Sequence, residues 1–184
     1  MITNNLNIFL IVFTACFLGF QNLNAQNNRP NLDNDSIRYY VLQKVNEHRK
    51  QNGRSNLLTN SLLNEAASLH CKYMSLEKKL THEQENKYNH YYRGTLPTDR
   101  VGYSAGENAL YNWVDETYTS EEIAEILFDQ WRQSPGHNEN MLYSWQYMGF
   151  DCFIGTESSP VNPDKRLYKH IKYKIYAVQV FTWE

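Results

Sequence analysis

The chain has 184 residues and a formal net charge of −2, from 18 Lys and Arg and 20 Asp and Glu. Acidic and basic side chains are interspersed and form no basic stripe, which argues against nucleic acid as a partner. This length suffices to bury one sizeable core, so we expect a single domain.

The first 25 residues predict an export signal that is removed from the mature protein. They carry no charged residue or histidine and hold a near-continuous apolar run, residues 8–20, before the small residue Ala25. This run of 13 residues is shorter than the roughly 20 that a helix needs to cross a bilayer. We therefore expect cleavage after Ala25, no transmembrane anchor in the mature form, and a secreted or periplasmic protein. The alternative is a lipoprotein with Cys16 lipidated, because residues 13–16 loosely resemble a lipoprotein cleavage box.

The domain is predicted to begin after a short polar stretch. Residues 26–34 contain a proline and show no periodicity, so we expect a flexible lead-in to a domain that spans residues 35–184. Asp35 or Ser36 is expected to cap the first helix, since apolar residues then recur at helical spacing until Gly53.

A second helix and a long loop are predicted next. The helix is expected to run from a cap at Ser61 to about Lys79, with a broadly buried face. From Leu80 to Trp113 the periodicity disappears and tyrosines are interleaved with Asn and Gly, which predicts a long ordered loop. The tyrosines between residues 88 and 118 either line an apolar or sugar-binding groove or fold back on the core.

The C-terminal part of the chain adds one helix and a pair of strands. The helix is predicted to begin near Ser120 and to end at Pro135 and Gly136. Two β segments follow, Tyr147–Ile154 and Tyr168–Trp183, and the turn-forming residues between them predict antiparallel neighbours. Helices that precede strands favour an α+β layered sandwich over repeated β-α-β units.

Two cysteines remain after removal of the leader, Cys71 and Cys152. An oxidising compartment would allow them to form a disulfide. The alternative is two buried thiols, because Cys71 follows an apolar helix face and Cys152 lies in a strand-like stretch. The residues leave this choice open.

Three polar motifs at predicted helix ends and loops could supply a functional site: Thr-His-Glu, Gly-Glu-Asn and Trp-Arg-Gln-Ser-Pro-Gly-His-Asn. Their His82, Glu107 and His137 could converge on zinc or magnesium, because three protein ligands leave one position for water. Their spacing matches no HExxH or paired CxxC motif. The alternative is a hydrogen-bonded polar cluster that holds the loops together.

Ser134 lies three residues before His137, which allows a serine hydrolase in which the imidazole takes the hydroxyl proton. Neither a GxSxG nucleophile elbow nor an obvious orienting acid accompanies the pair, and a Ser before Pro is typical of a helix end. Cys71 is a weaker nucleophile candidate, because a Cys on an apolar helix face is usually inert. Glu107, Ser134 and His137 are therefore the catalytic candidates if the protein is an enzyme.

In their order along the chain, these motifs resemble the cysteine-rich secretory, antigen 5 and pathogenesis-related (CAP) superfamily in its bacterial SCP-domain form. Residues 45–66 look like its first two helices, and His82 looks like its first cleft histidine. Residues 99–108 contain the equivalent of its Gly-Glu-Asn segment. Residues 131–137 are similar to its Trp-x-x-Ser-Pro-Gly-His signature, and residues 177–181 to its closing strand.

The resemblance implies a three-layer α-β-α sandwich with a central, mainly antiparallel sheet, and a cleft formed by two histidines and two acids. His82, Glu107 and His137 match three of the cleft positions, and Asn108 lies beside them in the sequence. Ser134 stands where many eukaryotic members carry a second Glu, which should lower the affinity for a cation. The family's extra cysteine-rich modules are absent.

The function we expect from this resemblance is a non-enzymatic binding module, exported to act on a lipid, sterol, cell-wall or protein ligand. The missing second acid and the lack of a nucleophile motif favour binding over the alternative, a metal-assisted or serine hydrolase. In that hydrolase, Glu107 or His137 would serve as the general base. In a third interpretation the cleft is vestigial and the domain is only structural.

Overall fold

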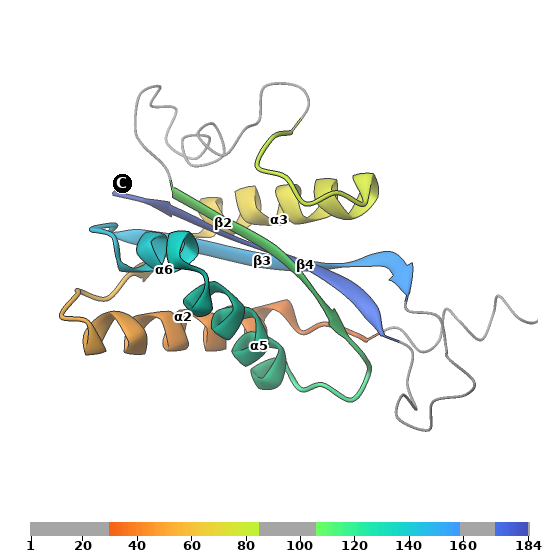
Figure 1. Cartoon of the computed structure of the whole chain (residues 1–184), viewed down its shortest axis with the longest axis horizontal. Coiled ribbons are helices and arrows are strands. Elements are labelled where there is room, and N and C mark those ends of the chain that lie inside the picture. The colour runs from red at the N-terminus through yellow and green to blue at the C-terminus, as the bar shows by residue number, and fades with distance from the viewer. Residues whose placement is uncertain (1–29, 85–105, 159–171, 184) are drawn as a thin grey trace, which may run out of the picture.

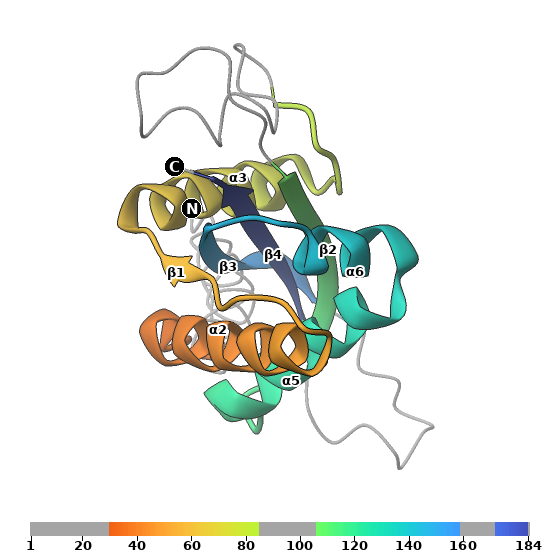
Figure 2. The ribbon, with the colours of Figure 1, turned by 90° about the vertical axis from the view of Figure 1, so that its left-hand side faces the viewer.

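The computed structural model describes residues 30–84, 106–158 and 172–183. α3 covers one face of a four-stranded sheet, α2 and α5 lie on the other side, and α6 lies beside β2 (Figures 1 and 2). In chain order the elements are α2 (Asn34–Gln51), β1 (Leu58–Thr59), α3 (Ser61–Glu77), β2 (Gly106–Val114), α5 (Ser120–Gln133), α6 (Pro135–Leu142), β3 (Tyr147–Ser158) and β4 (Tyr173–Thr182).

The sheet has the strand order β1-β3-β4-β2, which leaves β2 at an edge. β4 pairs antiparallel with both β3 and β2, whereas the two-residue β1 pairs parallel with β3. The predicted α+β sandwich, and the antiparallel pairing of the two C-terminal strands, are confirmed. Successive side chains of β2 point to opposite faces of the sheet, so both helical layers can contact this strand.

Two apolar clusters hold the three layers together. Val41 of α2, Leu127 of α5 and Phe150 of β3 are fully buried in one of them. Leu63 of α3 and Val178 of β4 are fully buried in the other. Each such side chain contributes about 1.5–3 kcal/mol on burial, so the sheet is anchored on both faces.

α3 rests directly on the backbone of β3. A Cβ atom added at Gly149 would lie 2.2 Å from the carbonyl carbon of Leu63, which is closer than any real contact of this kind. The neighbouring Asn64 Oδ1 accepts a hydrogen bond from the Phe150 N–H at 2.9 Å. The absence of a side chain at Gly149 therefore allows α3 to lie this close to the sheet.

Helices α2 and α3 begin one residue or more away from the predicted caps. The carboxylate of Asp33 caps α2 and the side chain of Asn60 caps α3 by accepting backbone N–H hydrogen bonds. The predicted caps are Asp35 or Ser36 for α2 and Ser61 for α3. All of these are good capping side chains, so propensity alone does not choose among neighbours.

The prediction of a continuous loop from Leu80 to Trp113 is wrong in its last part. Gly106–Val114 is strand β2, in register with β4 over its whole length. The pattern was missed because Glu107 and Asn108 are both buried, so the strand lacks the alternation of polar and apolar residues. Residues 80–84 contain neither helix nor strand, and residues 85–105 lie outside the described part.

Pro135 and Gly136 were predicted to end a helix, and they also begin one. α5 ends at Gln133, and Pro135 is the first residue of α6. Proline fits this position because the first turn of a helix leaves its N–H groups without intrahelical partners. The short α6 carries His137 in its first turn, so the proline positions a candidate site residue.

Cys71 and Cys152 are two free, buried thiols. Cys71 belongs to the apolar cluster beneath α3, and Cys152 to the cluster on the other face of the sheet. The Cys71 Sγ donates a hydrogen bond to the Asp151 carbonyl at 3.1 Å. Of the two alternatives that the sequence left open, the structure contains the second, without a disulfide between them.

Several predicted features lie outside the described residues. These are the export leader, the lipidation alternative at Cys16, residues 168–171 of the last β segment, and the tyrosines between residues 88 and 103. Among the later aromatic residues, Tyr111 is exposed and Tyr118 packs against the core. None of the helices described is long and apolar enough to cross a membrane.

Candidate functional site

Glu107, near the start of β2, is the centre of the candidate site. Its side chain is fully buried, and its Oε1 lies 2.8 Å from His82 Nδ1. Because a carboxylate oxygen accepts, the imidazole N–H donates in this hydrogen bond. His82 itself is about half exposed, with a side-chain exposure of 49%. The pair therefore joins a surface imidazole to a carboxylate inside the protein.

Gly106 allows this strand to begin under an aromatic ring. A Cβ atom at Gly106 would lie 2.8 Å from Trp145 Cζ2, so a larger residue would displace either the strand or the indole. The Gly-Glu-Asn motif thus combines a close backbone approach with two buried polar side chains.

A second, fully buried histidine belongs to the site and is not among the predicted site residues. His70 of α3 has Nε2 2.7 Å from the Thr81 carbonyl and Nδ1 3.1 Å from Gln84 Oε1. Its Nε2 also lies 3.8 Å from Glu107 Oε1. His70 therefore ties the segment that carries His82 to α3. A histidine on the buried face of an otherwise apolar helix was the available signal.

Asn108 of β2 holds α6 in place by side-chain hydrogen bonds. Its Nδ2 donates to the His137 carbonyl and to Gln179 Oε1, each at 3.0 Å. Asn140 Nδ2 donates to Asn108 Oδ1 at 3.0 Å and to the Glu107 carbonyl at 3.2 Å. These hydrogen bonds join α6 to a backbone carbonyl and a buried side chain of β2, which is in turn bonded to β4, so they fix the position of α6 against β2.

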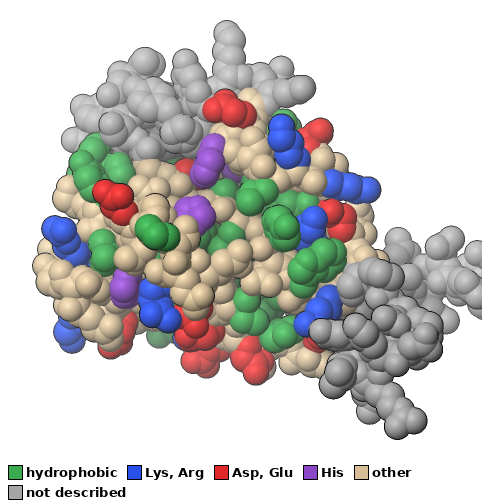
Figure 3. Space-filling view, viewed as in Figure 1, with side chains coloured by type: hydrophobic (Ala, Val, Ile, Leu, Met, Phe, Trp, Pro, Cys, Tyr) green, Lys and Arg blue, Asp and Glu red, His purple; other side chains and the backbone are tan. Residues whose placement is uncertain are grey.

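His137, in the first turn of α6, lies within electrostatic reach of His82. Burial lowers the pKa of His137 below its ordinary value, and His82 lowers this pKa further. A lowered pKa favours the neutral form of His137 near physiological pH. The structure thus brings together the three predicted residues His82, Glu107 and His137. Histidine surface is visible on the face shown in Figure 3.

Ser134 lies at the junction of α5 and α6 and is half-buried. Its backbone N–H donates to the Trp131 carbonyl, and its carbonyl accepts from the Asn138 N–H. The structure gives no hydrogen bond between the Ser134 hydroxyl and the His137 imidazole within the described residues. Ser134 therefore acts as a helix-junction residue, and a nucleophile–base pair is not formed.

A three-ligand metal site does not fit this arrangement. Within residues 30–84, 106–158 and 172–183, no group of three His, Cys, Asp or Glu side chains is placed to hold a metal ion. Glu107 Oε1 is hydrogen-bonded to His82 Nδ1, which is the position of a carboxylate that orients a histidine. Only His82 and His137 would then contact zinc or magnesium directly, fewer than the three protein ligands usual for zinc.

Residues 42–152 match the family model described as the cysteine-rich secretory protein family, CAP. A search of curated proteins gives no match. Several solved structures share the fold, among them three bacterial proteins. They are similar in backbone but below 25% in sequence identity, so they support the fold and nothing finer.

The first of these structures is an extracellular protein of Bacillus anthracis that contains an SCP domain, with 19% identity, a TM-score of 0.55, and 82% of this chain and 41% of that chain covered. The second is an outer surface protein of Borrelia burgdorferi, with 14% identity, a TM-score of 0.59, and 83% and 97% covered. The third is a cysteine-rich secretory protein of Staphylococcus aureus, with 22% identity, a TM-score of 0.50, and 84% and 40% covered. The chain thus spans about two fifths of the first and third proteins.

Proposed function

Because the chain belongs to the cysteine-rich secretory protein (CAP) family, we propose that it is an exported, non-enzymatic binding module whose ligand contacts His82 and His137. The observation that carries this proposal is the hydrogen bond between the half-exposed His82 and the buried Glu107 carboxylate. A surface imidazole held in one orientation by a buried partner is suited to selective recognition.

The chemistry of the two imidazoles narrows the ligand class. With the Nδ1 proton of His82 donated to Glu107, Nε2 is the ring nitrogen that remains to contact a ligand. The lowered pKa of His137 favours the neutral form of that ring. A neutral imidazole accepts hydrogen bonds, so His137 fits a ligand that donates hydroxyl groups, which both sterols and cell-wall glycans carry. Other lipid or protein ligands would need a different contact.

Binding is favoured over covalent catalysis by the surroundings of the candidate nucleophiles. Burial raises the pKa of the Cys71 thiol well above its ordinary value, and burial also raises that of Cys152. A thiol in this state is a poor nucleophile. Ser134 has no hydrogen bond to His137 in the described part of the chain. The alternative function, a metal-assisted or serine hydrolase, is supported by one feature, because a Glu–His pair can also act as a general base.

Export is proposed from the leader, residues 1–25, with the domain beginning at about residue 35. Support comes from the Bacillus anthracis structure, which is described as extracellular. Lipidation at Cys16 is the competing route to the same side of the membrane, and mass spectrometry of the exported protein distinguishes the two. Cleavage after Ala25 leaves an unmodified Gln26 terminus, whereas lipidation leaves a heavier chain that begins at Cys16.

Calorimetric titration of the exported protein tests the function. The ligands are sterol-containing vesicles, matched sterol-free vesicles and soluble cell-wall glycan fragments. Each is titrated into the native protein, into Glu107→Gln and into the control Glu121→Gln, which changes an exposed carboxylate on α5. We expect saturable binding in one of the hydroxyl-bearing arms, lost in Glu107→Gln and kept in Glu121→Gln. Binding that Glu107→Gln leaves unchanged would overturn the proposal, as would no binding in any arm.

A second titration, with zinc and magnesium, tests the hydrolase alternative. The comparison is with a His82→Ala/His137→Ala double variant whose fold is checked by circular dichroism. Saturable metal binding that the double variant loses would favour the hydrolase and justify a substrate screen. No metal binding in either protein would remove the metal-assisted mechanism.

A further inference from the structure

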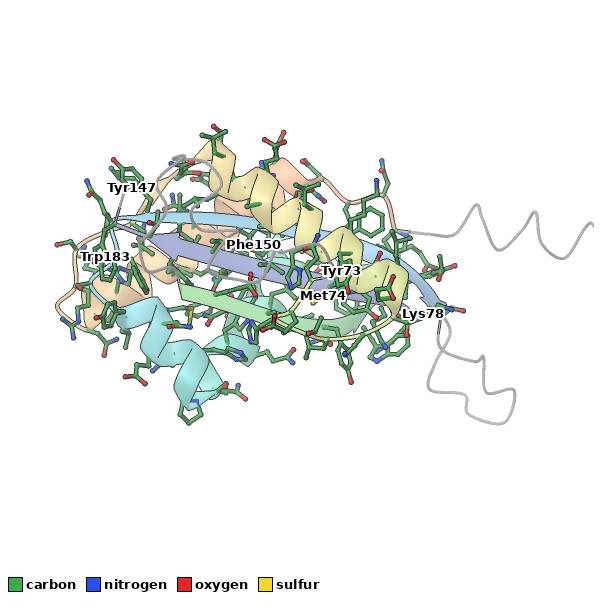
Figure 4. All side chains as sticks on the ribbon, turned by 90° about the horizontal axis from the view of Figure 1, so that it is seen from above. Tyr73, Met74, Lys78, Tyr147, Phe150 and Trp183 are labelled. Carbon is green, nitrogen blue, oxygen red and sulfur yellow. The ribbon has the colours of Figure 1, made fainter. Side chains whose placement is uncertain are left out.

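The outer face of α3 carries a line of exposed leucines. Leu62, Leu69 and Leu76 are 47%, 53% and 67% exposed. They are seven residues apart, so on a helix with 3.6 residues per turn they deviate from a straight line by only about 20° per step. The opposite face of the same helix packs on the sheet, and the view in Figure 4 looks down on α3.

The leucines are arranged symmetrically about Leu69. Leu62 and Leu76 lie seven residues before and after it on the same helix. A twofold axis beside Leu69, perpendicular to α3, would therefore place leucine against leucine along an antiparallel pair of helices. Such a self-complementary patch is the requirement of a twofold dimer interface.

The charges beside this line have the same symmetry. Glu65 and Lys72 are both exposed and lie on the same side of the leucine line, about 40° and 60° from it. With a rise of about 1.5 Å per residue, Glu65 is about 6 Å before Leu69 and Lys72 about 4.5 Å after it. The twofold axis brings Glu65 to the level of the partner's Lys72, twice in the interface. A parallel arrangement would instead put like charges at the same level.

We propose that a second copy of this chain docks on α3, forming an antiparallel homodimer centred on Leu69. The leucine line supplies the apolar contact, and the two Glu65–Lys72 pairs set the direction of the helices. The three leucines are exposed in the single chain and would be removed from water in such a pair. This interface uses the exposed side chains of α3, whereas His70 on the same helix is fully buried, so it is independent of the proposed ligand site.

Light scattering on the full exported protein gives the first test. We expect a dimer for the native chain and a monomer for Leu69→Lys. The dissociation constant of the dimer should rise about tenfold or more in this variant, because two buried ammonium groups would meet at the axis. Leu69→Met is the matched control and should remain dimeric. A native chain that is monomeric at the highest soluble concentration would overturn the proposal, and so would a dimer that Leu69→Lys does not weaken.

Charge reversal gives a test that misfolding cannot imitate. Glu65→Lys and Lys72→Glu should each weaken the dimer, because each places like charges opposite each other twice. The double variant Glu65→Lys/Lys72→Glu should restore it. Equal dimer strength in all four proteins would contradict the antiparallel arrangement.

Cysteine cross-linking then locates the axis. In a Cys16→Ser background, Leu69→Cys should form a disulfide-linked dimer under mild oxidation, since Leu69 faces the partner's Leu69. Leu62→Cys alone should not cross-link, whereas a mixture of Leu62→Cys and Leu76→Cys chains should. Cross-linking of Leu62→Cys with itself would indicate a parallel pair and overturn the proposed antiparallel dimer.

Vesicle binding tests a lipid surface as the other occupant of the leucine line. A native chain that is monomeric and binds vesicles, with this binding lost in Leu69→Lys, would assign the leucine line to a lipid surface instead.

Discussion

His70 Nε2 lies 3.8 Å from the same Glu107 oxygen that accepts the hydrogen bond from His82 Nδ1. The two imidazoles reach this oxygen from different elements, a buried helix face and the segment that follows the helix. His70 also forms a hydrogen bond with the backbone carbonyl of Thr81, which is the residue before His82. His70 is therefore a positioning residue, which acts on the surface histidine through the segment between them.

Replacement of His70 should release His82 from its orientation. His70→Leu keeps an apolar helix face but leaves the Thr81 carbonyl and the Gln84 amide without their partner, and we expect a loss of about 1–3 kcal/mol in stability. The imidazole signals of His82 should broaden or shift in NMR spectra, which a purely structural loss elsewhere would not cause. His70→Gln, with one retained donor, should recover part of both effects. Unchanged His82 signals in His70→Leu would contradict the positioning role.

The coupling between His82 and His137 predicts a measurable change in pKa. Removal of the neighbouring imidazole in His82→Ala should raise the pKa of His137, because one of the two causes of its lowered value disappears. Burial, the larger cause, remains, so the pKa should stay below the ordinary value of 6.5. An NMR titration of the His137 ring protons measures this directly. A His137 pKa that is the same in both proteins would show that the two rings do not interact.

The lowered pKa of His137 also predicts how stability depends on pH. In the unfolded chain this histidine takes up a proton near its ordinary value of 6.5, whereas the folded protein resists protonation until a lower pH. Between these values the unfolded state binds more protons, so the free energy of unfolding falls as the pH falls below 6.5. Urea denaturation above and below this pH measures the effect. The free energy of unfolding should fall less between the two pH values in His137→Asn than in the native chain. An identical loss would assign the pH dependence to other groups.

Gly149 should tolerate no side chain. Gly149→Ala would place a methyl group 2.2 Å from the Leu63 carbonyl carbon and 2.5 Å from the Asn64 backbone nitrogen, so α3 would have to move away from β3. We expect a loss of about 1–3 kcal/mol or more, measured by chemical denaturation. Gly136→Ala is the matched control, because nothing lies within 4 Å of a Cβ atom there. Equal stability of the two variants would mean that α3 can shift without cost.

Arg49 should be sensitive to a change that preserves its charge. Its guanidinium is almost fully buried and donates to the carbonyls of Ser55, Met141 and Tyr143 at 2.6–2.7 Å. Lysine has one ammonium group and cannot reach these separate acceptors in the same geometry. Arg49→Lys should therefore lower the free energy of unfolding by about 2–4 kcal/mol, because buried carbonyls lose their donors. Thermal denaturation beside the exposed control Arg54→Lys measures the difference.

The sequence predicted those parts of the fold that follow simple periodicity. The helices that became α2, α3 and α5 have apolar residues at helical spacing, and β3 and β4 have dense β-forming residues between turn signals. These elements depend mainly on their own residues and on burial of one face. The architecture could therefore be predicted without any knowledge of the distant contacts.

The candidate site was predicted in its residues but not in its arrangement. His82, Glu107 and His137 carry polar motifs that stand out in the sequence, whereas His70 is hidden in an apolar helix. Strand β2 was missed because Glu107 and Asn108 are buried by partners from α3 and α6. Burial of this kind is set by tertiary contacts and has no local signature.

The role of Glu107 needed the structure as well. Spacing alone made it a candidate metal ligand equal to the two histidines. The contact with His82 Nδ1 gives it another role, in which the carboxylate orients an imidazole and holds its proton on one nitrogen. Such roles depend on which atoms face each other, and residue types alone do not determine them.

Because Cys71 and Cys152 form no disulfide, the stability of this domain should not depend on the redox state of its surroundings. Cys71 and Cys152 lie in separate apolar clusters on opposite faces of the sheet, and neither contributes a covalent cross-link. A fold built in this way needs no oxidant to form, so it can be reached equally well in a reducing and in an oxidising compartment. It should also keep its stability in the presence of strong reductants, unlike small secreted domains that depend on disulfides.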